Sequence, residues 1–164
     1  MSENRKICAA ERTLLRHTLA TVAYRGGKAL RGAPESFGNF GSGDGGRTPV
    51  QILAHLCDLY DWALSIVSGK QAWRDSPPLP WEKEVERFFA SLKKFDEYLA
   101  SGAELYEGPA ALFQGPIADS LTHIGQIAML RRMAGHKIKG ENYHQAEIVA
   151  GRVGVAQATP RREF

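Results

Sequence analysis

The stretch Ile117-Ala-Asp-Ser-Leu-Thr-His-Ile-Gly-Gln-Ile-Ala-Met-Leu130 has no interior proline, and its apolar residues recur at intervals of three and four. This pattern predicts a helix that turns one face toward a core. Asp119 and His123 are four residues apart, so on a helix their side chains lie one turn apart on the same face. A carboxylate and an imidazole in that arrangement can hold one metal ion, pair with each other, or each satisfy another buried group.

Three other stretches have the same periodicity and are predicted to be helices, at residues 8–31, 50–67 and 81–100. In the last of these, apolar residues alternate steps of three and four, as at a helix–helix interface: Val85, Phe88, Leu92, Phe95 and Leu99. The charged residues of the same stretch are interpreted as a solvated face: Lys83, Glu84, Glu86, Arg87, Lys93, Lys94 and Glu97. Together the four helices predict an all-α four-helix bundle that forms a single domain over residues 1–164.

Short signals mark the ends of these helices. Thr48-Pro-Val-Gln51 is a helix start, because threonine caps, proline occupies the first helical position and glutamine completes a capping box. The first helix has two alternative ends, at Gly26-Gly27 or at Gly32. Gly115-Pro116 is expected to open the last long helix and Gly135 to end it.

The segments between and after the helices have distinct compositions. Residues 32–46 are rich in glycine but lack the phosphate-loop signature, which predicts a long loop after the first helix. Residues 71–80 contain Ser-Pro-Pro-Leu-Pro and are predicted to be a stiff, non-helical linker. We expect a short last helix at residues 141–150, followed by an extended or poorly ordered tail at residues 151–164.

Composition narrows the class of protein. The net charge of +3 is small, the basic residues are interspersed with acidic ones, and in the tail only the Arg161-Arg162 cluster is notable, so nucleic-acid binding is not expected. No unbroken apolar run reaches the roughly 20 residues of a membrane helix. The N-terminal residues lack the apolar core of a signal peptide. With only two cysteines, a disulfide framework is not expected, and we predict a cytoplasmic protein with no membrane association.

Three polar residues fall on otherwise apolar helix faces: His55, Asp119 and His123. Each has an ordinary explanation, because buried histidines and aspartates usually have a hydrogen-bonding partner. However, an ionised aspartate inside a helical bundle costs several kcal/mol, roughly, unless a cation compensates it. A divalent metal held by two imidazoles and one carboxylate would compensate it and would leave coordination positions open. This donor set is compatible with zinc, nickel, iron(II) and manganese.

Two motifs resemble those of the DinB/YfiT-like superfamily of metal-binding four-helix bundles. They are Leu53-Ala-His-Leu-Cys-Asp-Leu-Tyr-Asp-Trp62 and His123-Ile-Gly-Gln126, which is close to the family's His-Arg-Gly-Gln. The resemblance covers about residues 8–150 and includes the long loop after the first helix. It implies that His55 and His123 bind a divalent metal. Asp119 stands where the family has a second histidine on the last helix, and its charge would make a metal-bound water less acidic.

The resemblance also implies a function, namely a metal-dependent enzyme that acts on a small molecule. Relatives include transferases and isomerases that use a low-molecular-weight thiol, and hydrolases, in which the metal acidifies a thiol or water. Gln126 is expected to hydrogen-bond a ligand or a metal-bound water, or else to contact another helix. Tyr143 and His144 are the candidates for a general base.

Other interpretations remain open from the sequence. A single Glu141-x-x-His144 is not enough for a di-iron carboxylate site, which needs the motif twice. A metal-binding or stress-response bundle without turnover is the alternative to an enzyme, because a fold does not imply a function. A homodimer is compatible with the sequence.

Overall fold

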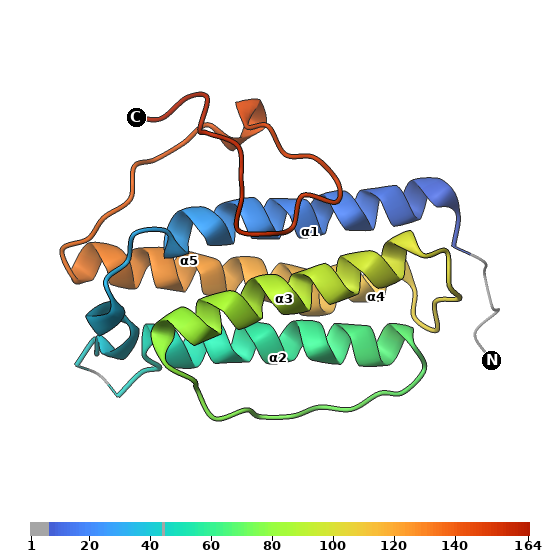
Figure 1. Ribbon diagram of the computed structural model, residues 1–164, viewed down its shortest axis with the longest axis horizontal. Helices are drawn as coiled ribbons and strands as arrows, with labels where there is room; N and C mark the ends of the chain where they lie inside the picture. The colour runs from blue at the N-terminus through green and yellow to red at the C-terminus, as the bar shows by residue number, and fades with distance from the viewer. Residues whose placement is uncertain (1–6, 44) are drawn as a thin grey trace.

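The computed structural model describes residues 7–43 and 45–164, and this part of the chain is all-α, as predicted. Its long helices lie side by side in Figure 1: α1 (Ala9–Leu30), α2 (Pro49–Val67), α3 (Trp81–Ala100) and α5 (Ala118–Met133). Both α3 and α5 pack against α1 and against α2, so α1 and α2 occupy opposite corners of the assembly. Among the described residues, the β pairing is limited to one isolated antiparallel bridge, between Glu141 and Glu163.

The first helix continues through Gly26-Gly27 and ends next to Gly32, the second of its two predicted ends. α1 ends at Leu30, and Gly32 follows with a φ of +67°, a conformation that glycine adopts without strain. A Cβ atom at Gly26 would lie 2.8 Å from Cζ of Phe88 on α3. Glycine at this position therefore serves close packing between α1 and α3 rather than helix termination.

The second helix begins at the predicted capping box. The backbone N–H of Thr48 donates to Oε1 of Gln51 over 2.8 Å, and Pro49 occupies the first turn. By length and composition α2 could cross a membrane, although 61% of that stretch is buried inside the protein. A core helix meets the same criterion, and α2 lies in the core between α3 and α5.

The last long helix starts earlier than predicted. The chain is already helical in α4 (Pro109–Leu112), passes through a wider π-type turn at Phe113–Ile117 and then enters α5. Pro109 suits a first helical position, where no N–H donor is needed. Gly115 takes a non-helical ψ of −105° and so absorbs the distortion that Pro116 imposes. The glycine–proline pair marks a kink within a longer helical segment.

The C-terminal segment also differs from the prediction. In place of a helix at residues 141–150, it contains one 3₁₀ turn, Tyr143–Gln145, and is otherwise extended along α1 (Figure 1). Nζ of Lys28 on α1 binds Glu141 over 2.6 Å and Glu163 over 2.9 Å. The carboxylate of Glu141 thus has a charged partner although this part of the chain is not helical. Because Glu141 and Glu163 lie near the two ends of the segment, these ion pairs hold both ends against α1.

Candidate metal centre

The three predicted metal ligands converge between two helices. His55 comes from the second turn of α2, while Asp119 and His123 come from the first two turns of α5. One donor atom from each side chain lies within 4.8 Å of the other two. Nε2 of His55 is 3.6 Å from Oδ2 of Asp119, and Nε2 of His123 is 3.6 Å from Oδ1.

These separations suit a shared metal ion better than direct pairing. A direct hydrogen bond between nitrogen and oxygen spans about 2.7–3.2 Å, so both contacts are too long. Two ligand atoms on one tetrahedral zinc, each about 2.0–2.1 Å from the ion, lie roughly 3.3–3.4 Å apart. The His55–Asp119 and His123–Asp119 separations are close to that value, and small side-chain movements would bring all three donors to one ion.

A buried hydrogen bond sets the position of α2 against α5 next to these ligands. The hydroxyl of Tyr60 on α2 lies 2.5 Å from Oγ of Ser120, which itself donates to the carbonyl of Ile117 over 2.7 Å. Burial raises the pKa of Tyr60, so its hydroxyl stays protonated. Because Ser120 follows Asp119 directly, this bond also holds the backbone that carries Asp119 against α2.

Gln126 orients one of the imidazoles. Its Oε1 lies 2.8 Å from Nδ1 of His123, and a carbonyl oxygen can only accept a hydrogen bond. In this arrangement Nδ1 carries the proton, and the lone pair of Nε2 faces Asp119. A hydrogen bond to the far nitrogen is the usual way in which a metal-binding histidine is held.

The charge state of His55 also suits a ligand. Burial lowers its pKa most, the neighbouring His123 and Arg47 lower it further, and Asp119 opposes the shift. The imidazole is therefore neutral at neutral pH, which is the form that binds metals. Its side chain is 19% exposed and that of His123 is 14% exposed.

Asp119 differs from the expectation that it would be buried. Its side chain is 45% exposed, so water can solvate the carboxylate. The argument that a buried aspartate requires a compensating cation is therefore wrong for this residue. The case for a metal depends instead on the convergence of the three donors, and the exposed side of Asp119 leaves room for water or a substrate.

Two cavities flank the three donors. One, of about 360 Å³, is lined by His55 and Asp75. The other, of about 780 Å³, is lined by His123 and Gln126. Both have volumes typical of small-molecule sites. Arg47, which precedes the cap of α2 and had not been singled out in the sequence, lines both.

The linker between α2 and α3 covers part of the site. The ring of Trp73 lies 5.7 Å from that of His55 and 6.1 Å from that of Trp62 on α2, in edge-to-face geometry in both cases. Trp73 thus shields one side of the imidazole. No periodicity or motif in the proline-rich linker points to this contact.

Tyr143 and His144, the candidates for a general base, line neither of the two cavities. The guanidinium of Arg25 on α1 lies 4.3 Å from the centre of the Tyr143 ring, and Tyr24 contacts the same ring edge-on. His144 is exposed. The segment that carries both residues lies along α1, which is diagonal to α2, the helix of His55 (Figure 1).

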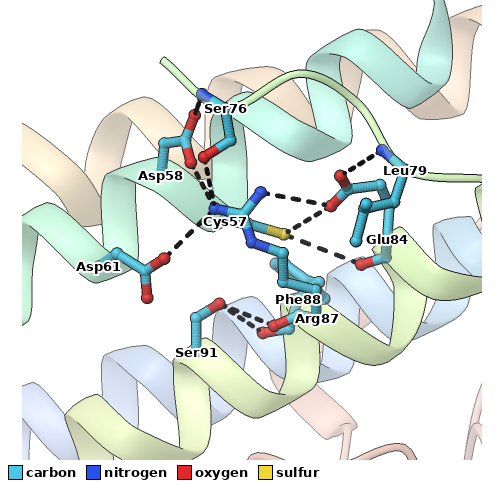
Figure 2. A network of polar contacts seen from close by, with 9 residues as sticks. All are labelled: Cys57, Asp58, Asp61, Ser76, Leu79, Glu84, Arg87, Phe88 and Ser91. Atoms are coloured by element: carbon cyan, nitrogen blue, oxygen red, sulfur yellow. Dashed lines mark hydrogen bonds and ion pairs between the residues drawn. The ribbon is translucent and has the colours of Figure 1, made fainter. Parts of the chain in front are cut away.

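Two charged residues of α3 that were interpreted as solvated form a buried network instead (Figure 2). The Glu84 side chain is fully buried, and it accepts hydrogen bonds from the thiol of Cys57 over 3.5 Å and from the backbone N–H of Leu79 over 2.8 Å. Burial and the Glu84 carboxylate raise the pKa of Cys57, so the thiol stays protonated. The signal was present in the sequence, because Glu84 is four residues before Phe88 and shares its core-facing side.

Arg87 connects this network to α2. Its guanidinium binds Asp58, lies 3.2 Å from Asp61 and 3.6 Å from Glu84, and donates to Oγ of Ser76 over 3.2 Å (Figure 2). Burial alone would lower the pKa of Arg87, but the hydrogen bonds to the two aspartates raise it overall. Asp58 in turn accepts the backbone N–H of Ser76 over 2.8 Å, so the network holds the linker against α2.

A third cavity, of about 510 Å³, lies over this network and is lined by Trp62, Arg74 and Arg87, without any of the three proposed metal ligands.

No protein-family model, curated protein or solved structure matches the chain. The interpretation of the site therefore depends on its own geometry.

Proposed function

We propose that this protein is a DinB-like four-helix bundle that binds one divalent metal ion through His55, Asp119 and His123 and acts on a small molecule. The reaction would be a thiol-dependent transfer or a hydrolysis. The observation that carries the proposal is the convergence of three donors from α2 and α5 at ligand spacing, beside two cavities of small-molecule size. On this proposal the protein works in the cytoplasm with a low-molecular-weight thiol or water as the second reactant.

Each residue has a distinct role in this proposal. When bound, the metal would supply Lewis acidity that lowers the pKa of a thiol or water. His55 and His123 would be neutral ligands, and Gln126 would hold the His123 ring in place. Asp119 would contribute a negative charge from an open side, and Trp73 would limit access of water to His55. Zinc, nickel, iron(II) and manganese all accept this donor set.

One observation favours a second candidate, a metal-binding bundle without turnover. Tyr143 and His144, which were the candidates for a general base, contact α1 or solvent instead of the cavities. Such a protein would bind the same metal through the same ligands and would differ only in lacking a reaction. Metal content and turnover must therefore be measured separately.

The first experiment measures metal content. Protein purified without chelator, and protein reconstituted with zinc, nickel, manganese or anaerobic iron(II), is analysed by elemental mass spectrometry. We expect about one ion per chain in the wild type and a large loss in His55→Ala and His123→Ala. His17→Ala removes an exposed histidine of α1 and is the matched control. A wild type that retains no metal after reconstitution would refute both candidates.

The second experiment separates the two candidates. Cobalt(II)-substituted protein is titrated with glutathione and other small thiols, and its visible spectrum is followed. A thiol that binds the metal changes the spectrum, and turnover is then tested with electrophilic co-substrates. Metal binding with no spectral response to any thiol, and no hydrolytic turnover, would favour the bundle without activity.

A further inference from the structure

Arg47 is placed to act on whatever occupies the cavities beside the proposed metal ligands. It follows Gly45-Gly46 and directly precedes the α2 cap, Thr48. Gly45 has a φ of +76°, a turn conformation that favours glycine. Two residues after this turn, Arg47 lines both cavities. The Arg47 side chain is exposed, and no ion pair involves it within the described residues.

The two cavities differ in charge. The smaller one, on the His55 side, contains the carboxylates Asp58 and Asp75 as well as Arg47, so its charge is mixed. Among the described residues that line the larger one, on the His123 side, Arg47 is the one permanently charged side chain. Among these described lining residues, an anion entering the larger cavity would meet the Arg47 guanidinium and no carboxylate.

The rest of the larger cavity is apolar and open. Ile52, Met129, Leu130 and Met133 line it, and the two methionines are 64% and 52% exposed. Exposed methionines form adaptable apolar surfaces that suit ligands of varied shape. Gly125 also lines the cavity, and a Cβ there would meet no atom within 4 Å, so the wall beside His123 is open.

We infer that the substrate of the proposed metal centre is an organic anion with an apolar body, bound in the cavity beside His123 with its acidic group on Arg47 and its apolar body on Met129 and Met133. This inference rests on the proposed function, since it names the substrate class of the same site. Arg47 presents several N–H donors to a carboxylate or phosphate. Gln126 and Thr122 add neutral polar groups at the cavity edge.

The test uses octanoate as the anionic probe, with octanol as a neutral probe of the same length. Methionine methyl groups labelled with carbon-13 report binding directly, because the chain has three methionines and two of them line this cavity. Titrations are performed by NMR on the metal-loaded and metal-free wild type, on Arg47→Met and on Arg74→Met. The last variant removes an arginine that lines a different cavity.

We expect octanoate to shift the Met129 and Met133 methyl signals and to bind more tightly than octanol. Arg47→Met should weaken octanoate about tenfold, as is usual for a lost charge-assisted bond that is partly solvated, and should leave octanol unchanged. Arg74→Met should have no effect. Equal binding of the two probes, or unchanged octanoate binding in Arg47→Met, would overturn the inference.

The outcomes also separate this inference from the proposed function. If metal is absent but octanoate binds and depends on Arg47, the anion site stands and the metal proposal fails. If metal binds but octanoate does not depend on Arg47, the anion site fails alone. Methyl shifts that follow protein concentration instead of octanoate would assign this apolar surface to contact between copies of the chain and would also refute the inference.

Discussion

Arg87→Met should be strongly destabilising, because it removes the one cation of the network in Figure 2 while keeping an unbranched apolar stem. The Glu84 side chain is fully buried, that of Asp58 is 4% exposed, and both face the Arg87 guanidinium. Without it, two carboxylates would remain in a poorly solvated region with only N–H and thiol donors. Breaking a buried ion pair from one side costs about 3–5 kcal/mol of the free energy of unfolding.

A loss of that size is easy to measure. For a chain of this length, each kcal/mol lowers the Tm by about 2–4 °C, so we expect a fall of roughly 6–20 °C. Urea unfolding followed by circular dichroism gives the free energy, and thermal unfolding gives the Tm. Lys83→Met is the matched control, because Lys83 pairs with Glu86 on the outer face of the same helix and is 62% exposed. Its effect should stay within about 0.5 kcal/mol.

A double variant tests the physical reason. In Glu84→Gln with Arg87→Met, the amide oxygen can still accept the N–H of Leu79, and the uncompensated charge at Glu84 is gone. Part of the stability should therefore return relative to Arg87→Met alone. A loss below about 1 kcal/mol in Arg87→Met, or no recovery in the double variant, would show that these charges are effectively solvated and would refute the reasoning.

Three further changes have expected outcomes. Gln126→Leu should weaken metal binding by roughly 10- to 100-fold in competition titrations, since it removes the acceptor that orients His123, and unchanged affinity would argue against that role. Gly26→Ala should lower the free energy of unfolding by roughly 1–2 kcal/mol because its Cβ would meet a ring of α3, whereas Gly125→Ala, which has open space, should not destabilise. The hydrogen bond from Lys28 lowers the pKa of Glu163 from its ordinary value of 4.5. The interaction between Lys28 and Glu163 therefore stabilises the fold above about pH 4.5, and this stabilisation is lost as the pH falls through the lowered pKa. Lys28→Met should return the Glu163 pKa toward its ordinary value in carboxyl NMR titrations, and an unchanged pKa would contradict the assigned cause.

Much of the fold could be predicted because local patterns decide it. The capping box at Thr48 and the seam of α3 require only sequence neighbours, and both were read correctly. The errors arose where tertiary contacts override a local rule. Gly26 looks like a weak point of a helix until the Phe88 ring beside it is known. At residues 141–150 the predicted helix is absent, and Glu141 instead forms an ion pair with Lys28, which is distant in sequence.

The candidate site was predicted in part for the same reason. The spacing of Asp119 and His123 fixes their common face from the sequence alone, and the helical phase of His55 directs it inward. The exposure of Asp119 depends on where α5 meets its neighbours, which no spacing reveals. Trp73 and Arg47 lie outside the long helices, so their approach to the ligands follows from the path of the connecting segments rather than from periodicity.

The buried network and the candidate metal centre are joined by one segment of chain. His55 and Asp58 are three residues apart on α2 and therefore neighbours on its surface, and both line the smaller cavity together with Ser76. Asp58 and Glu84 accept backbone N–H groups from Ser76 and Leu79, which fixes a proline-rich linker that has no secondary structure of its own. That linker carries Trp73 to the His55 ring. The buried charges around Arg87 thus hold the linker in place as a wall of the site. The surroundings of His55 therefore depend on this network, although Arg87 does not contact any of the proposed metal ligands.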